Sequence, residues 1–127
     1  WCAARRVDER EATVLNCDGV DDHGHVAVMY TGRRPATLLS AVAAAAREGG
    51  TTHEAMRMIP GVLTDSVAFS DAGLQSVTFM RGSVRSFLRV HRPSDNLSRL
   101  RGTGIAETAA LMASTVRVLL RPSSEAT

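Results

Sequence analysis

The sequence has no lysine, few aromatic side chains and no long apolar run, and each absence excludes a class of protein. All 15 basic residues are arginine and 13 residues are acidic, so the net charge is only +2. Nucleic-acid-binding proteins usually gather basic residues on one face beside stacking aromatics, but only 4% of this chain is aromatic. We therefore expect no nucleic-acid partner. No apolar run reaches the roughly 18 residues of a membrane-spanning helix, so we expect no membrane span in this chain.

Cysteine is also scarce, with only Cys2 and Cys17 in the chain. Their positions do not decide whether they pair, because pairing depends on how the first residues fold back. We interpret Cys17 as a buried, inert thiol. At 127 residues, 44% of them hydrophobic, the chain has the size and composition of one globular domain.

Short apolar runs alternate with helical stretches along the chain, which predicts an α/β fold. We expect a central, mostly parallel or mixed sheet flanked by helices. Strands are predicted at 12–16, 25–30 and 74–80, and helices at 36–48, 65–72 and from 103 to Pro122. Residues 53–54 are expected to open a short helix, and residues 81–90 to form a loop with a short strand at its end. Residues 1–11 and 122–127 are expected to be peripheral.

The last helix has the most regular apolar pattern in the sequence. Its apolar residues recur at steps of four and three, which places them in one stripe along an α-helix. The stripe consists of Ile105, Ala109, Met112, Val116 and Leu119.

Two polar residues follow predicted strands, at the positions where α/β folds place their chemistry. Asp18 ends the run Leu15–Asp18, and His91 lies in a turn stiffened by Pro93. A carboxylate and a neutral imidazole are both normal zinc ligands. Taken singly, each also has an ordinary interpretation, because Asp before Gly is a common turn residue and a loop His is often a surface residue. The same is true of Asp65, which can cap a helix.

The order of three motifs resembles the zinc exopeptidase family that includes the bacterial and yeast vacuolar aminopeptidases. The motifs are Asn16-Cys17-Asp18-Gly19, the segment from Thr64 to Leu74, and His91-Arg92-Pro93-Ser94-Asp95-Asn96-Leu97. Glutamate carboxypeptidases and glutaminyl cyclases are relatives of this family. The resemblance implies that residues 1–127 are the C-terminal part of one catalytic domain.

The resemblance also implies a site with two zinc ions and a peptide substrate. Asp18 and His91 match metal ligands of the family, whereas Asp65 and Asp95 match supporting positions. Asp95 is equally well interpreted as a cap of the next segment. In such a site a metal-bridging water attacks the scissile carbonyl of an N-terminal peptide bond, which makes the enzyme an aminopeptidase.

The sequence departs from the family pattern in ways that bear on activity. The family's other ligands and its general base precede the strand that carries Asp18, where this chain has only 17 residues and no histidine. Two ligands do not hold a catalytic zinc, which needs three. Val90 and Ser66 replace a Tyr and a His that many relatives have. We therefore expect no catalytic base in this chain, and no hydrolysis by this chain without the missing N-terminal half.

Two alternatives to the aminopeptidase remain open at this point. One is a glutaminyl cyclase-like acyltransferase with a single zinc, and the other is a non-catalytic binding module on a degenerate scaffold. The compartment is unknown, and only the family resemblance favours a secreted or periplasmic protein.

Overall fold

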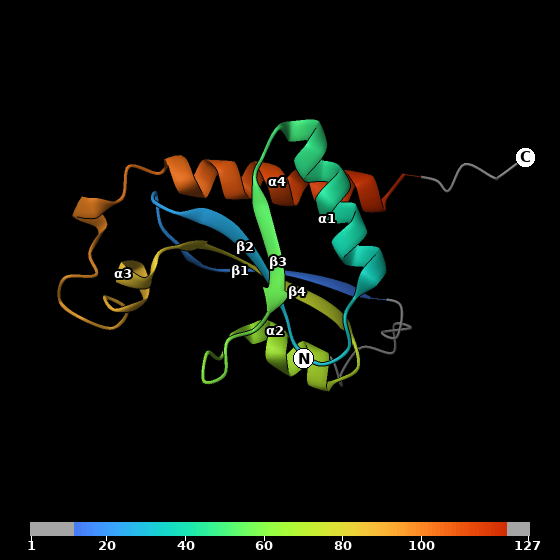
Figure 1. The fold of residues 1–127 in the computed structure, drawn as a ribbon, viewed down its shortest axis with the longest axis horizontal. Helices are drawn as coiled ribbons and strands as arrows, with labels where there is room; N and C mark the ends of the chain where they lie inside the picture. The colour runs from blue at the N-terminus through green and yellow to red at the C-terminus, as the bar shows by residue number, and fades with distance from the viewer. Residues whose placement is uncertain (1–11, 122–127) are drawn as a thin grey trace, which may run out of the picture.

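The computed structural model describes residues 12–121, which form an open mixed sheet with helices on both faces (Figure 1). Predictions for residues 1–11 and 122–127, including any pairing of Cys2, lie outside this range. In chain order the elements are β1 (Thr13–Val20), β2 (His25–Tyr30), α1 (Ala36–Gly49), β3 (His53–Arg57), α2 (Asp65–Asp71), β4 (Gln75–Gly82), α3 (Val84–Phe87), a 3-10 turn (Leu97–Arg99) and α4 (Thr103–Leu119).

The four strands lie in the order β1-β4-β2-β3. β1 is parallel to β4 and β3 is parallel to β2, whereas β2 and β4 are antiparallel. The predicted α/β fold with a mixed sheet is therefore confirmed. Because of these directions, the C-terminal ends of β1 and β4 meet the N-terminal end of β2 at one rim of the sheet.

One face of the sheet is closed by α1 and α4 over an aliphatic core (Figure 1). Alternate residues of β2 and β4 point into it, and they are joined by Leu38 and Val42 of α1 and Leu111 of α4. Phe79, at the centre of β4, has no exposed surface. Burial of this continuous apolar layer is the main stabilising contribution to the fold.

The opposite face carries the other set of alternating residues and is covered only in part. α2 covers the first half of β4, where the hydroxyls of Thr64, Ser66 and Thr78 form a buried hydrogen-bonded cluster. Ser66 is 1% exposed, so this residue, which departs from the family pattern, has a packing role here. The rest of the face consists of Ala27 and the methionines Met29, Met56, Met58 and Met80.

The predicted apolar stripe on α4 is only partly buried, with Met112 and Leu119 packed against the core. Ile105 is 50% exposed and Val116 is 41% exposed. The buried residues are Gly104, Thr108, Leu111 and Thr115, which lie one position earlier in each turn. Small residues allow α4 to pack closely, and each buried threonine hydroxyl is satisfied by a carbonyl one turn back, at 2.8 and 2.9 Å.

Three local predictions are wrong. Residues 53–57 form strand β3, not a helix, because this short segment pairs with β2 along its whole length. The segment 81–90 contains the short helix α3 followed by a turn, where a loop ending in a short strand was expected. β1 extends to Val20, beyond the predicted end at residue 16, and it is a half-exposed edge strand.

None of the helices in residues 12–121 is both long enough and apolar enough to cross a bilayer.

Candidate functional site

A cleft of about 1110 Å³ lies on the half of the sheet face that α2 leaves uncovered. Its floor is apolar and includes Ala27, Met29, Met56 and Met80. The walls are the loop that follows β3, at 59–63, and the segment that joins β4 to α4, at 83–102. Exposed apolar side chains of both walls face the cleft, among them Leu63 and Val90. Concave apolar surfaces with a few polar groups are typical ligand sites.

Asp18 lies at the rim of this cleft and is exposed. It does not follow a strand, as the sequence suggested, but lies within β1 at an irregularity of the sheet. Cys17 is opposite Phe79 while Val20 is opposite Arg81, so β1 has one more residue than β4 in this stretch. Such a β-bulge re-aims a side chain next to the sheet, and Gly19, at a φ of 61°, supplies the backbone conformation.

His91 and Asp95 line the same cleft from the 83–102 segment. His91 is exposed and has a φ of 63°, the only non-glycine residue with a positive φ among those described. This conformation is uncommon for a residue with a Cβ, although histidine adopts it more often than most. Asp95 does not cap the next turn: Asn96 does so, accepting a hydrogen bond from the Ser98 N–H at 3.2 Å.

Asp65 is separated from these residues. It is the first residue of α2, is exposed, and does not line the cleft. The residue at the N-cap position of α2 is its neighbour Thr64, whose hydroxyl bonds to Ser66 and Thr78 instead of capping the helix. The structure thus brings Asp18, His91 and Asp95 to one cleft and leaves Asp65 outside it.

Sequence reasoning missed a histidine–carboxylate pair in the cleft. His25 Nε2 lies 3.3 Å from the Glu54 carboxylate, and both residues line the cleft. The predicted strand that begins at His25 could have indicated this position. An antiparallel strand begins at the rim where its neighbour ends, so His25 lies near the C-terminal end of its neighbour β4. Glu54 gave no such signal, since its segment was expected to be helical.

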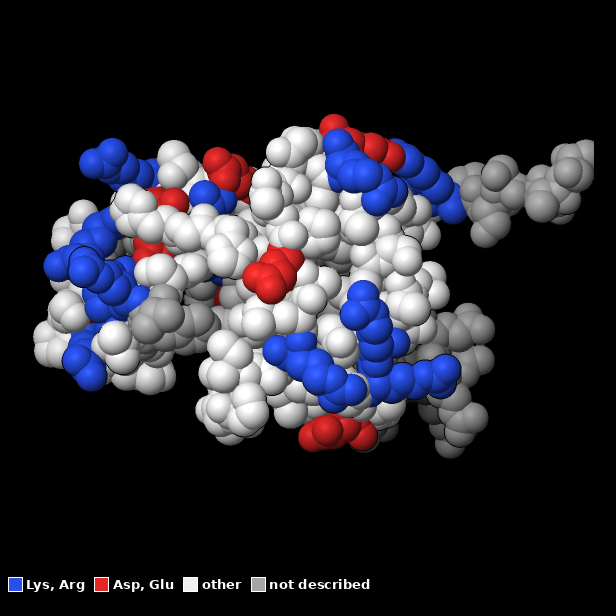
Figure 2. Space-filling view, viewed as in Figure 1, with Lys and Arg blue, Asp and Glu red and all other residues white. Residues whose placement is uncertain are grey.

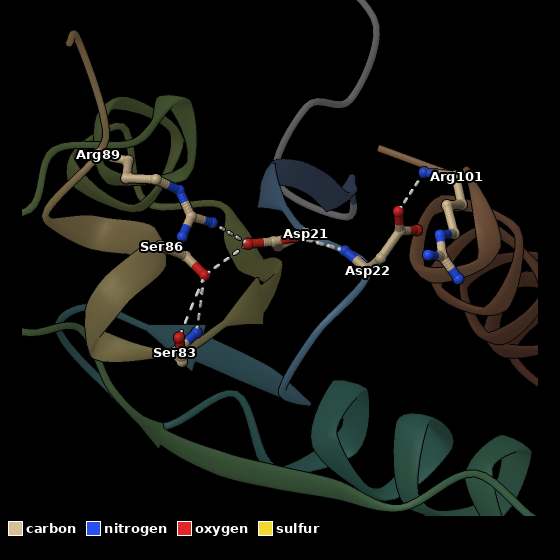
Figure 3. A network of polar contacts seen from close by, with 6 residues as sticks. All are labelled: Asp21, Asp22, Ser83, Ser86, Arg89 and Arg101. Atoms are coloured by element: carbon tan, nitrogen blue, oxygen red, sulfur yellow. Dashed lines mark hydrogen bonds and ion pairs between the residues drawn. The ribbon is translucent and has the colours of Figure 1, made fainter. Parts of the chain in front are cut away.

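The sequence also gave no indication of a polar network formed by Asp21 and Asp22 (Figure 3). Asp21 is 9% exposed and accepts hydrogen bonds from Ser86 Oγ at 2.7 Å and Arg89 Nη2 at 2.6 Å. The Ser86 hydroxyl, backbone N–H groups and Arg89 lower the pKa of Asp21 despite its burial. Bonds from the N–H groups of Gly104 and Arg101 lower the pKa of Asp22 to about 2. Both carboxylates are therefore ionised at neutral pH.

No protein-family model and no curated protein matches the sequence. The structure, however, is similar to a crystal structure of a protein from Clostridium acetobutylicum described as a putative peptidase, with a TM-score of 0.70. The two proteins therefore share this fold. The two chains are 20% identical over 84% of this chain and 25% of the other. The chain thus spans about a quarter of the length of that protein, and the likeness concerns the fold.

The side chains that line the cleft include two residue types that bind zinc, but too few of them to form a zinc site. Asp18 and His91 offer a carboxylate and an imidazole to one cleft. Among residues 12–121, however, no group of three histidine, cysteine, aspartate or glutamate side chains is placed to hold a metal ion. A zinc site needs at least three protein ligands, so these residues could form only part of one.

Cys17 lies next to Asp18 and is exposed, contrary to the expected buried thiol. Partial burial of its sulfur, and then the charge of Asp18, raise the pKa of this thiol. The thiol form therefore prevails at neutral pH, which makes Cys17 a poor nucleophile and a poor metal ligand.

Arginines gather over the end of the molecule where α3 and the segment leading to α4 lie (Figure 2). Two of them are paired with carboxylates, Arg81 with Glu107 and Arg89 with Asp21. The segment 81–101 holds six arginines: Arg81, Arg85, Arg89, Arg92, Arg99 and Arg101.

Proposed function

We propose that this chain forms part of a zinc-dependent aminopeptidase, in which it supplies two metal ligands and the floor and walls of the substrate cleft described above. The observation that carries the proposal is that Asp18 and His91, from segments far apart in sequence, line one cleft. The peptidase-like fold supports it, as does the resemblance of the three sequence motifs.

Asp18 and His91 would hold the zinc ions together with ligands from outside residues 12–121. Zinc bound there would polarise the scissile carbonyl and activate a water molecule. Asp95 and Glu54 border the same cleft and would attract the free amino group of the substrate. This attraction would favour cleavage at the N-terminus of a peptide.

The methionine floor would receive the side chain of the substrate's first residue. Methionine side chains are flexible and polarisable, so they adapt to apolar groups of different shape. We therefore propose peptides with a large apolar first residue as the preferred substrates.

Zinc titration of the 127-residue chain and its variants tests the proposed ligands. Isothermal calorimetry should show weak zinc binding by the wild-type chain and none after either Asp18→Ala or His91→Ala. Asp65→Ala is the matched control, because Asp65 lies outside the cleft, and it should bind zinc like the wild type. Equal binding by all four proteins would contradict the assignment.

An activity assay addresses the role of the missing ligands. We expect no turnover of an aminoacyl chromogenic substrate by this chain with zinc. Robust turnover that is lost in His91→Ala would show that the chain carries a complete site and that the missing half is not required.

A non-catalytic binding module is the second candidate, because residues 12–121 lack a group of three metal ligands. A longer protein containing this chain would then bind peptides with an apolar first residue without cleaving them. Mass spectrometry of such peptides after incubation with zinc and that protein distinguishes the two functions. The same protein's zinc content separates a two-zinc aminopeptidase from a single-zinc glutaminyl cyclase-like enzyme.

A further inference from the structure

The turn between β1 and β2 contacts both ends of the segment that carries His91. Asp21 bonds to Ser86 and Arg89 near the start of the 83–102 segment. Asp22, the next residue, accepts bonds from the Arg101 N–H at its end, and from the Thr103 hydroxyl and Gly104 N–H at the start of α4. Figure 3 shows the two carboxylates directed to opposite sides of the turn.

The two contacts differ in kind, since one is a buried ion pair and the other caps a helix. Asp21 is buried, and a buried carboxylate is held in place by the partners that compensate for its lost hydration. Its ion pair with Arg89 spans 2.6 Å, with 26% of the arginine side chain exposed. Asp22 supplies the cap that α4 lacks locally, because the N-cap residue Gly102 has no side chain.

The 83–102 segment has little regular structure. It contains one four-residue helix and one 3-10 turn, and residues 90–99 are nearly all exposed. From Ser83 to Leu100, the backbone hydrogen bonds outside helices and strands connect residues three apart in sequence. Among the described residues, every side-chain hydrogen bond that joins this segment to a distant part of the chain ends on Asp21 or Asp22.

The position of the turn gives these contacts a consequence for the cleft. Asp21 follows Asp18 by three residues, and its N–H is bonded to the carbonyl of Arg81 in β4 at 2.8 Å. The turn is therefore fixed to the sheet beside Asp18. Holding Ser86 and Arg89 against it fixes the backbone two residues before His91.

We propose that Asp21 and Asp22 are positioning residues that hold His91 in a fixed place relative to Asp18. The chain would then present its two donors as a preformed pair, before any metal or additional protein segment binds. The role of His91 and Asp18 as metal donors rests on the metallopeptidase function proposed above. The effect of Asp21 and Asp22 on the order of the 83–102 segment does not depend on metal.

Nuclear magnetic resonance of the full 127-residue chain without metal tests the structural part. In Asp21→Asn, which keeps the side-chain shape but loses the charge, we expect amide heteronuclear NOE values of residues 88–100 to fall. Hydrogen exchange of core amides in β4 and α1 should stay at the wild-type rate. A similar loss of order in Asp22→Asn, centred on residues 99–104, would show that the turn holds both ends of the 83–102 segment. We call this pair of contacts the clamp.

Matched controls separate positioning from general stability. Glu48→Gln removes another carboxylate–arginine pair, to Arg121 at 2.7 and 2.9 Å, on the far side of the molecule. It should leave the order of 88–100 unchanged. If Asp21→Asn does not fold, Arg89→Gln breaks the same pair from its more exposed partner and takes its place. The proposal is overturned if 88–100 stay as ordered as in the wild type, or if loop and core lose protection equally.

A zinc titration followed at the His91 ring protons gives the second readout. Asp21→Asn should weaken the apparent zinc affinity by roughly tenfold, as expected when groups behind metal ligands are removed. Asp18→Ala should abolish the response while leaving 88–100 ordered. If the wild-type ring shows no response to zinc, the metallopeptidase proposal fails, while the metal-free measurements still decide whether the clamp exists.

Discussion

The two faces of the sheet differ in what covers them and in what their residues are suited to do. On one face, α1 and α4 close over branched aliphatic side chains and Phe79, and the layer contains no charged group. On the other face, α2 covers a cluster of hydroxyls, and the remainder is a methionine floor below a cleft. Adjacent residues of one strand therefore serve different purposes, since side chains alternate between the faces.

This difference explains why the candidate site could form without weakening the fold. Fold stability comes mainly from the helix-covered face, so exposed polar groups at the cleft rim remove little buried apolar area from the core. Functional groups in other proteins are similarly placed on loops that a stable scaffold holds. Three comparisons between matched residues and one pH dependence test this difference between the two faces, from the largest expected effect to the smallest.

The neighbours Phe79 and Met80 give the most direct comparison of the two faces. Phe79→Ala should lower the free energy of unfolding by about 3–5 kcal/mol, because it leaves a cavity in the closed core. Met80→Ala should lower it by only about 2 kcal/mol, since water in the cleft can occupy part of the space left. Urea denaturation with an unchanged m-value measures both. Equal losses of unfolding free energy in the two variants would contradict the view that stability comes mainly from the helix-covered face.

Gly104 lies where α4 meets the turn beside the cleft, and it tests whether the two regions are rigidly joined. A Cβ at 104 would lie 2.1 Å from the Asp21 carbonyl oxygen, so Gly104→Ala should destabilise the protein by about 1–3 kcal/mol. Gly49→Ala, in α1, should be neutral or stabilising by up to about 1 kcal/mol, because its Cβ would meet only Thr51 at 3.7 Å. Thermal unfolding of both variants checks this. Similar melting temperatures would mean that α4 can shift away from the turn.

Buried threonine hydroxyls occur on both sides of the sheet and can be compared directly. Thr78→Val removes a hydroxyl at the centre of the cluster with Thr64 and Ser66, and should cost about 1–2 kcal/mol. Thr108→Val should lower the free energy of unfolding by about 0.5 kcal/mol or less. The Thr108 hydroxyl donates to the Gly104 carbonyl, which is already part of the helix and stays there in the variant. Denaturant midpoints measure the difference. A larger loss of stability in Thr108→Val than in Thr78→Val would mean that the more important polar contacts lie on the helix-covered face.

The smallest effect concerns the exposed carboxylate of Asp22 and depends on pH. Its pKa is lowered from 3.8 to about 2 in the folded chain. A lowered pKa means that the ionised form stabilises the folded state above about pH 4, and that this contribution is lost as the pH falls towards 2. The Gly104 amide should therefore exchange faster relative to core amides over this range. In Asp22→Asn the exchange rate of the Gly104 amide should no longer depend on pH in this way. If the pH dependence remains in this variant, another carboxylate causes it.

Regular elements with local signals were predicted well from the sequence. α1 begins after Pro35 and ends at Gly49. The next residue, Gly50, has a φ of 66°, the left-handed conformation that glycine favours after a helix end. β2 and β4 matched their apolar runs closely. Each of these segments carries its own boundary residues, so no distant contact was needed to define it.

The errors lie where distant contacts decide the outcome. The buried side of α4 is set by close approach to the β1–β2 turn at Gly104, which favours small residues over the apolar stripe at Ile105 and Val116. β3 is a strand because β2 offers it a partner. The network of Asp21 and Asp22 joins residues 65 to 82 positions apart, which no local pattern could indicate.

In the candidate site, Asp18 and His91 were brought to one cleft, as the motif order suggested, and Asp95 with them. Whether they bind zinc stays a prediction. Asp65 lies outside the cleft, because α2 packs on the other half of the same sheet face, and its supporting role stays a prediction.

The positive φ of His91 implies a conflict between stability and side-chain chemistry at this position. Glycine is usually less stabilising than alanine by about 0.5–1 kcal/mol, but a left-handed conformation disfavours residues with a Cβ by about 1–2 kcal/mol. His91→Gly should therefore be at least as stable as His91→Ala, the reverse of the usual order. The backbone here suits a residue with no side chain, yet the chain keeps an imidazole, as expected where a protein retains a less stable residue for its reactivity.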